Sequence, residues 1–211
     1  MEHSKIECLP PEEIEKRSFE IITEELLKRN ISLPKEEELI TKRVIHTSAD
    51  FDYAETLCYS KGAVEILKEL IKNGADIVTD TNMALAGINK KALTKFGGEA
   101  HCFMADEEIA LLAKQRNVTR AAVSMEKAAK IEKPVVFAIG NAPTALIKLY
   151  EMIEKLDWKP AFIIGVPVGF VNVEAAKELI LKTNIPYIIN RGRKGGSNIA
   201  AAICNAVLYQ V

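Results

Sequence analysis

Five short apolar runs alternate with amphipathic stretches from Ala75 to the end of the chain. The runs are rich in Val, Ile and Ala, and they cover residues 75–79, 100–103, 134–139, 161–164 and 185–189. Helices are expected between and after them, at residues 83–95, 106–130, 143–156, 172–182 and 196–209. Short buried strands that alternate with helices are typical of a parallel sheet covered on both faces. The sequence therefore predicts an α/β core with five parallel strands.

The first 73 residues have a different texture, with dense charge and no convincing strand. An apolar stripe at helical spacing runs through residues 10–30, behind an acidic first turn that favours a helix start. Further helices are expected over residues 34–45 and 61–73. Because no linker separates the two textures, we interpret residues 1–211 as one domain, with a helical N-terminal part (1–73) and an α/β core (74–211).

Composition excludes several classes of protein. Hydrophobic residues make up 48% of the chain and its formal net charge is -1, which disfavours both a disordered chain and general nucleic-acid binding. The apolar runs are far shorter than the ~20 residues of a membrane helix, and the charged start does not resemble a secretory signal. Four scattered cysteines without a Cys-x-x-Cys pair disfavour disulfides and zinc. We expect a cytoplasmic protein that binds neither nucleic acid nor a membrane.

Glycines gather in the loops that follow the expected strands. Sheets of this kind bind ligands outside the carboxyl ends of their strands. Six of the 11 glycines fall there, namely Gly140, Gly165, Gly169, Gly192, Gly195 and Gly196. Turn geometry is the alternative explanation for any single glycine, since glycine reaches positive φ without strain. Together they favour a wide, flat ligand that the backbone approaches closely.

The last of these loops carries three cations, Arg191, Arg193 and Lys194, just before an expected helix start at Ser197. Free N–H groups at a helix N-terminus attract anions, and arginine adds bidentate recognition of carboxylate or phosphate. A solvated charge run is the alternative. Ordinary nucleotide binding is disfavoured because the chain has neither G-x-x-x-x-G-K-[ST] nor G-x-G-x-x-G.

His46 is the candidate catalyst among three histidines. It stands beside polar residues at an expected helix end, and imidazole exchanges protons near neutral pH. A helix-ending histidine stabilised by the helix dipole is the alternative. His101 lies within an expected strand, where a structural role is favoured. A metal site around His46 with nearby carboxylates is disfavoured, because no second histidine has ligand spacing, and no G-x-S-x-G elbow is present. Arg120, beside small residues, could reach a cleft.

Taken together, six segments resemble the precorrin-8X methylmutase family, including its cobalt-precorrin-8 branch. The segments are residues 17–20, 43–50, 79–83 together with 86–88, 139–146, 165–171 and 191–197. The resemblance spans roughly residues 14 to 208. Gly-Asn-Ala-Pro-Thr at 140–144 and Gly-Arg-Lys-Gly-Gly-Ser at 192–197 are its most specific parts.

The resemblance implies a flavodoxin-like three-layer α/β/α sandwich and a homodimer that binds a tetrapyrrole polycarboxylate near the subunit interface. It implies an isomerase that moves a methyl group from C11 to C12 of the macrocycle, giving hydrogenobyrinic acid or its cobalt counterpart. No cofactor and no protein-bound metal are expected, since any cobalt would arrive inside the substrate. His46 would be the general acid, with Thr47 or Asp50 as possible orienting neighbours.

The residues expected to bind substrate are Ser18, Arg43, Thr47, Asp80, Met83, Gly87, Arg120, Gly140, Asn141, Ala142, Pro143, Gly165, Val166, Pro167, Gly169, Phe170, Arg191, Arg193, Lys194, Gly195, Gly196 and Ser197. Whether the natural substrate carries cobalt is left open by the residues. Two other functions also stay open at this point: a non-catalytic tetrapyrrole carrier, and an α/β protein that binds a nucleotide or a sugar phosphate.

Overall fold

The structure, a computed structural model, describes residues 7, 9–156 and 158–211. Six strands form one sheet in the order β1-β6-β5-β4-β2-β3. Their bounds are β1 Leu57–Tyr59, β2 Asp76–Thr79, β3 Ala100–His101, β4 Val135–Ile139, β5 Phe162–Gly165 and β6 Tyr187–Asn190. Strands β2 to β6 pair in parallel, whereas β1 is antiparallel to β6. The predicted α/β core is therefore confirmed.

Strand β1 corrects two predictions. The sheet has six strands instead of five, and the extra strand lies in the N-terminal part that was expected to be wholly helical. Leu57 pairs with Asn190 and Tyr59 with Ile188, which extends the sheet beyond β6. A strand of three residues is too short to show an alternating pattern, and its partner lies about 130 residues later in the chain, so local sequence could not reveal it.

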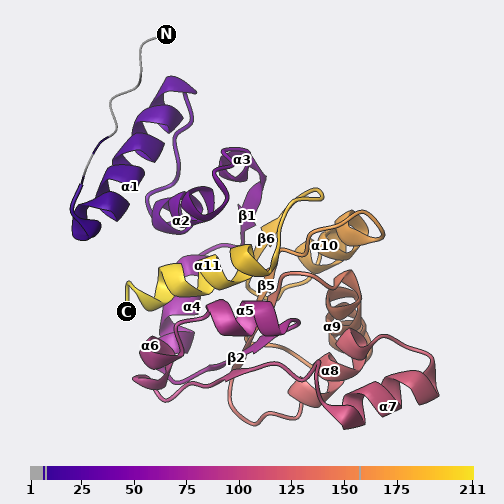
Figure 1. The fold of residues 1–211 in the computed structure, drawn as a ribbon. Coiled ribbons are helices and arrows are strands. Elements are labelled where there is room, and N and C mark those ends of the chain that lie inside the picture. Colours follow the sequence, from indigo (N-terminus) through magenta and orange to yellow (C-terminus); the bar gives the residue numbers. More distant parts are fainter. Residues whose placement is uncertain (1–6, 8, 157) are drawn as a thin grey trace.

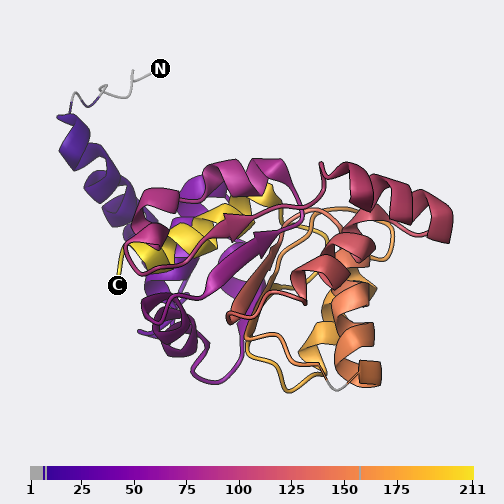
Figure 2. The ribbon, with the colours of Figure 1, turned by 90° about the horizontal axis from the view of Figure 1, so that it is seen from below.

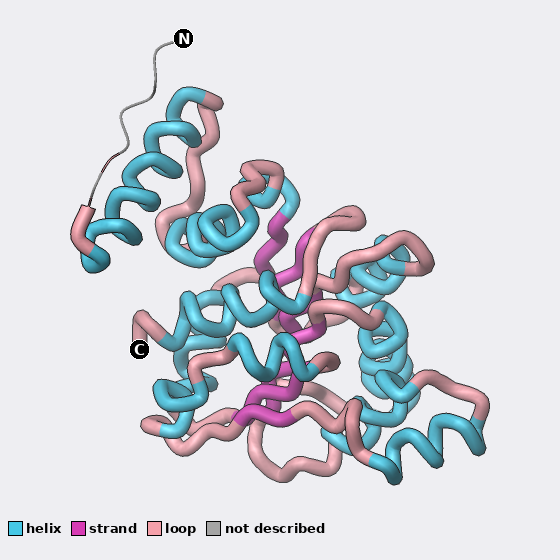
Figure 3. Tube along the Cα trace, in the orientation of Figure 1, coloured by secondary structure: helices cyan, strands magenta, loops and turns pink. Residues whose placement is uncertain are grey.

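Helices cover both faces of the sheet and make three layers (Figures 1 and 2). The helices are α1 Pro11–Lys28, α2 Glu38–Ser48, α3 Tyr53–Thr56, α4 Ala63–Lys72, α5 Asn82–Gly87, α6 Lys90–Thr94, α7 Glu107–Arg116, α8 Arg120–Ala128, α9 Pro143–Leu156, α10 Val173–Leu181 and α11 Ser197–Leu208. Residues of α2, α4 and α11 share one core cluster with the sheet, and residues of α8, α9 and α10 share the other. Figure 3 shows the strands as the middle row between the two helical layers.

The strand residues alternate between the two clusters. In β4, Val136 and Ala138 pack towards α11, whereas Val135, Phe137 and Ile139 pack towards α8 and α9. Every residue of β4 is buried, because both faces of the sheet are covered. This double burial explains why the central strands read as continuous apolar runs.

Two of the predicted long helices are each divided in two. The stretch 83–95 forms α5 and α6, and the stretch 106–130 forms α7 and α8. Asn117 ends α7 in a left-handed conformation (φ 52°), and the Thr119 hydroxyl accepts a hydrogen bond from the Ala122 N–H to cap α8. Asn89 caps α6 in the same way. These short polar side chains compete with the helix backbone for hydrogen bonds, which favours a new helix start at each point.

Candidate functional site

Four loops meet at the edge where the parallel strands end. The Gly196 N–H donates to the Val166 carbonyl (2.9 Å), so the loop after β6 lies against the loop after β5. The Thr81 and Ser197 hydroxyls are 2.7 Å apart, which joins the loop after β2 to the start of α11. The loops that the sequence analysis expected to share an edge are thus brought together.

Asp80 holds the loop between β4 and α9. Its carboxylate is fully buried and accepts hydrogen bonds from the N–H groups of Gly140 (2.8 Å), Asn141 (2.8 Å) and Ala142 (2.5 Å). Burial raises the pKa of this carboxyl, and the three N–H donors oppose that shift. In this structure both oxygens of the Asp80 carboxylate support residues 140–142. Its direct contact with a substrate stays a prediction.

Several of the glycines are explained by packing within the chain. A Cβ on Gly140 would lie 2.7 Å from the Ser197 Cα, and one on Gly195 would lie 2.0 Å from the Val166 oxygen. On Gly165 it would meet the Ile189 side chain at 2.4 Å. Close contacts between the loops, and between a loop and a strand, therefore explain these glycines, and no ligand is needed to explain them. Gly192 differs, since it has φ +73° and open space around it.

The cations of the last loop already have acidic partners. Arg191 lies 3.2 Å from Glu178 and Arg193 lies 3.7 Å from Glu174, both on α10. Lys194 pairs with Asp50 and Asp52. Since both arginine side chains are 59% exposed, these ion pairs are weak and can exchange for other anions.

Arg120 is the exception among the predicted cations. It is exposed at the first position of α8, and no ion pair to it is found within the described residues. The neighbouring Thr119 hydroxyl donates to the Thr144 hydroxyl (2.9 Å) at the start of α9. Arg120 therefore lies at the edge where the strands end, with its charge unpaired.

Apolar side chains are exposed along the same edge. Met83 follows β2 and is 71% exposed, and Phe170 follows β5 and is 83% exposed. Val168 and Val171 beside Phe170 are exposed as well, and the Arg193 guanidinium lies 5.6 Å from the Phe170 ring centre. A cluster of exposed apolar side chains on a protein surface often marks a binding site.

His46 is exposed in the last turn of α2 and lies against α1. Its ring centre is 5.6 Å from that of Phe19. The Arg43 guanidinium stacks over the same Phe19 ring at 4.9 Å and binds both carboxylate oxygens of Glu15 (2.7 and 3.0 Å). The hydrogen bond from Arg43 lowers the pKa of Glu15. Ser18, beside Phe19, is half-buried and its hydroxyl donates to the Ile14 carbonyl.

The end of α2 is fastened to the loop after β6. Lys194 Nζ lies 2.5 Å from an Asp50 oxygen and 2.6 Å from an Asp52 oxygen, and its hydrogen bond lowers the pKa of Asp50. Asp50 is only four residues after His46. The structure thus connects the helix of the predicted acid to the loop of the predicted cations.

Neither of the expected neighbours orients His46 in this structure. The Thr47 hydroxyl donates to the Arg43 carbonyl (2.9 Å), and the Asp50 carboxylate binds Lys194. Among the described residues, the ring in contact with His46 is Phe19. Phe19 was not among the predicted site residues, although it lies in the segment 17–20 that carries part of the resemblance.

The predicted binding residues divide by exposure. The exposed ones are Thr47, Met83, Gly87, Arg120, Asn141, Phe170, Arg191, Arg193 and Lys194. The half-buried ones are Ser18, Arg43, Ala142, Pro143, Gly169 and Gly195. The buried ones are Asp80, Gly140, Gly165, Val166, Pro167, Gly196 and Ser197. Direct substrate contact stays a prediction for all three groups, and several members of the buried group bind neighbouring loops.

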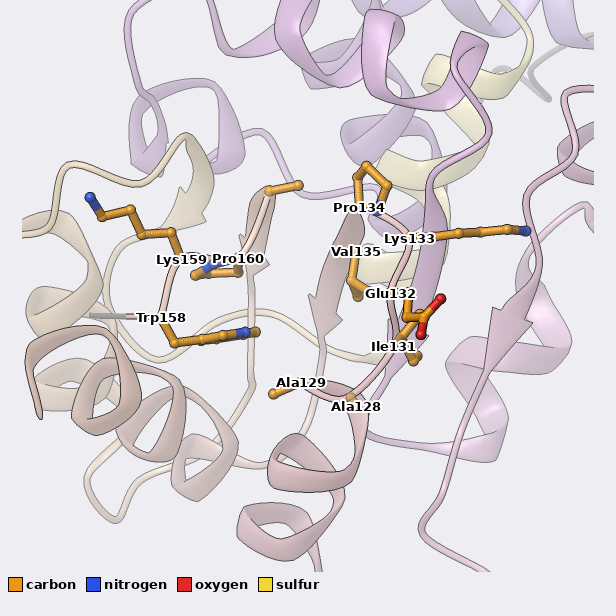
Figure 4. A pocket seen from close by; sticks show the side chains of 11 residues that line it. Ala128, Ala129, Ile131, Glu132, Lys133, Pro134, Val135, Trp158, Lys159 and Pro160 are labelled. Atoms are coloured by element: carbon orange, nitrogen blue, oxygen red, sulfur yellow. The ribbon is translucent and has the colours of Figure 1, made fainter. Parts of the chain in front are cut away.

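A hollow of about 380 Å³ lies at the other edge of the sheet, where β4 and β5 begin (Figure 4). It is lined by residues such as Lys133, Pro134, Trp158 and Pro160. None of the predicted site residues lines it. Most of the predicted site residues lie instead in the loops at the carboxyl ends of the strands.

Within the described part of the chain, no cluster of three or more His, Cys, Asp or Glu side chains could hold a metal ion. The carboxylates of Asp50 and Asp52 bind Lys194. None of the described helices is long and apolar enough to cross a membrane.

Comparison with known proteins gives a consistent result. The model of the precorrin-8X methylmutase family matches residues 13–210. The cobalt-precorrin-8 methylmutase of Priestia megaterium is 42% identical over 93% of this chain and 87% of that protein. The enzyme of the same name from Salmonella typhimurium is 41% identical over 95% of this chain and 96% of its own length.

A solved structure agrees with these sequence matches. The precorrin-8X methylmutase of Thermus thermophilus superposes with a TM-score of 0.83 at 34% identity, covering 93% of this chain and 96% of that one. The range that the family model matches includes all but the first two residues of α1, all of α2 and all four loops at the edge where the strands end.

Proposed function

The chain belongs to the precorrin-8X methylmutase family, and we propose that it is an isomerase of cobalamin biosynthesis. The reaction moves a methyl group from C11 to C12 of precorrin-8X or cobalt-precorrin-8 and gives hydrogenobyrinic or cobyrinic acid. One observation carries this conclusion: the family match over residues 13–210 includes the His46 helix and every loop of the site. Any cobalt belongs to the substrate, and we propose that the protein needs no cofactor of its own.

The edge of the sheet suits a broad macrocycle rimmed by carboxylates. The exposed side chains of Met83 and Phe170 offer an apolar surface for the ring. Arg120, Arg191 and Arg193 offer charge for the rim. Substrate carboxylates can replace Glu174 and Glu178 at low cost, because an exposed ion pair is worth about 0–1 kcal/mol.

We propose His46 as the general acid that protonates the macrocycle and favours the tautomer from which the methyl group migrates. Three features support this role. The ring is exposed, the Phe19 ring lies 5.6 Å from it between centres, and the Lys194 bridge fastens its helix to the cationic loop. An intramolecular shift needs no second reactant, so a held geometry and one proton transfer are sufficient, and general acid catalysis typically supplies about 10²–10⁴-fold.

We further propose a homodimer in which α1 contributes to the interface. Helix α1 projects from the body of the molecule beside α2 (Figures 1 and 2). Its inner side buries Ile22 and Leu26, whereas Ile14, Ile21 and Leu27 remain exposed. Sedimentation equilibrium is expected to give twice the monomer mass. A monomer at micromolar concentration would contradict the dimer.

We assign the core to the flavodoxin-like folds. Counted along the chain, the five parallel strands lie in the order 2-1-3-4-5, which is the flavodoxin order, with β1 added at one edge. In that order the switch point lies between β2 and β4, where Asp80 supports the loop of Gly140. We also place the protein in the cytoplasm, since Cys58, Cys102 and Cys204 are free thiols.

Conversion of the substrate chromophore tests the function. Purified protein is incubated with precorrin-8X, and separately with cobalt-precorrin-8, and the absorption spectrum is followed to that of hydrogenobyrinic or cobyrinic acid. We expect a new product spectrum with at least one substrate. A shifted spectrum of bound but unconverted substrate would identify a carrier instead, and no response to either tetrapyrrole would overturn the proposal.

A further inference from the structure

Lys177 is a buried lysine outside the residues assigned to the site. It lies on α10 with its side chain fully buried, on the face that also buries Val173 and Ile180. Its Nζ donates to the carbonyl oxygens of Gly192 (2.7 Å) and Lys194 (2.9 Å). Within the described residues no carboxylate forms an ion pair with it. Its partners are thus two backbone carbonyls of the loop after β6.

Such a position is costly. Removing an ammonium from water without a carboxylate partner disfavours its charged form. Burial accordingly lowers the pKa of Lys177 to about 8, and the Glu174 carboxylate opposes the shift. Apolar residues fill the rest of this face of α10, so packing alone would favour another apolar side chain. The hydrogen bonds from Lys177 Nζ to the two loop carbonyls therefore explain why a lysine occupies this buried position.

Three side chains of α10 contact consecutive residues of the loop. Glu178 pairs with Arg191, Glu174 pairs with Arg193, and Lys177 lies between them and binds the backbone. The two glutamate pairs are exposed and exchangeable, whereas the Lys177 hydrogen bonds are buried. Helical spacing explains the set, since positions 174, 177 and 178 lie on neighbouring rows of one helix surface.

Hydrogen bonds from the side chains of Lys177 and Asn190 orient the backbone of the loop. The carbonyls of Gly192 and Lys194 point inward to Lys177, and the Asn190 amide donates to the carbonyls of Arg191 (3.1 Å) and Lys194 (2.9 Å). With these carbonyls held, the Arg191 and Arg193 side chains stay at the surface, where both are 59% exposed and lie against Glu178 and Glu174. The hydrogen bonds from Lys177 and Asn190 thus fix the backbone that carries the two guanidinium groups.

We propose that Lys177 is a positioning residue for the methylmutase reaction, which holds the loop of residues 191–194 so that Arg191 and Arg193 meet the carboxylates of the substrate. This inference rests on the proposed function. Lys177 itself touches no substrate and acts through the two arginines. Its loss should weaken substrate binding and leave the proton transfer at His46 unchanged.

Steady-state kinetics of Lys177→Met test the proposal. Methionine keeps most of the apolar stem and removes the donor. We expect KM for the tetrapyrrole substrate to rise about 10-fold while kcat stays within about twofold. A merely structural role would lower the active fraction, and hence the apparent kcat, without moving KM. The matched control is Lys182→Met, an exposed lysine at the end of the same helix, which should leave both constants unchanged.

A second variant covers a folding failure. If Lys177→Met does not fold, Lys177→Gln retains one amide donor and should raise KM about threefold. An unchanged KM in whichever variant folds would overturn the inference about Lys177. If the wild-type protein converts neither substrate, the proposed function fails first. If the wild-type protein is active and the KM of the variant is unchanged, only the role proposed for Lys177 is excluded.

Discussion

The carboxylate of Asp80 accepts a hydrogen bond from the N–H of Gly140 at 2.8 Å, across the switch point between β2 and β4. The other oxygen accepts from the next two N–H groups, so one side chain satisfies three donors in front of α9. A negative charge at this place also favours the start of a helix.

We expect Asp80→Asn to destabilise the fold by about 2–4 kcal/mol. The asparagine NH₂ would face a backbone N–H, which leaves buried donors without an acceptor. Urea unfolding measures the loss. The control is Asp106→Asn, whose half-buried carboxylate pairs with Lys127 and should cost about 0–1 kcal/mol. Equal losses in the two variants would contradict the role of Asp80.

Gly140→Ala should destabilise the protein by about 2–3 kcal/mol. The added methyl would overlap backbone atoms of Gly196 and Ser197, which cannot move aside as a flexible side chain could. Gly192→Ala is the comparison, because that site has open space and only its positive φ costs about 1 kcal/mol. Thermal unfolding ranks the two. If Gly140→Ala proved the milder change, the close contact between the loops would be wrong.

His46→Ala should lower kcat by about 10²–10⁴-fold and change KM by less than about threefold. The variant removes the proton donor from an exposed position, so its stability should match the wild type. Chromophore conversion gives the rate. His101→Gln serves as the control, because His101 binds Asp76 at the start of β2, away from the ends of the strands where the site lies. The His101→Gln variant should therefore keep the wild-type kcat. Full turnover by His46→Ala would exclude it as the acid.

Arg120→Ala should raise KM about 2–5-fold with kcat unchanged, since one partly solvated contact to a substrate carboxylate is lost. Arg116→Ala is the matched control, because Arg116 pairs with Glu126 on the outer helices. Initial rates over a range of substrate concentrations separate the two constants. The same KM in both variants would remove Arg120 from the site.

The pH dependence of stability should report Lys177. Its pKa is lowered from 10.5 to about 8 in the folded protein, so the unfolded chain binds more protons between these values. Stability should therefore gain about 1–3 kcal/mol from this group as the pH rises from 8 to about 10.5. The charged groups around it are Glu174, Glu178 and the cations of the loop.

Urea midpoints at several pH values measure this slope. Lys177→Met should lose the rise, and Lys182→Met should keep it. A wild-type slope retained in Lys177→Met would assign the titration to another group.

Much of the fold could be predicted because double burial leaves a local pattern. The five parallel strands appear within a few residues of their expected bounds, as in β4, where all five residues are apolar. Strand β1 could not be predicted, since its three residues carry no period and its partner is β6. The breaks at Asn89 and Thr119 were also missed, although cap residues are a local signal.

The sequence indicated which kinds of residue form the candidate site and which loops carry them, but it did not indicate their contacts. The cationic loop and His46 were identified from the chain alone, and the fold fastens one to the other through Lys194 and Asp50. The partners of the cations were not foreseeable. Glu174 and Glu178 read as ordinary acidic positions of a surface helix, and Lys177 reads as a third charged residue beside them.

What the sequence alone determined was local: which segments are strands and helices, which loops follow them, and which family motifs those loops carry. These properties depend on neighbouring residues and on periodicity. The tertiary structure decided which distant atoms meet. Only there does Asp80 bind three N–H groups, Gly140 press against Ser197, and Lys177 hold the loop of the arginines. Hydrogen bonds and close contacts act over a few ångströms, so their partners are known only once the chain is folded.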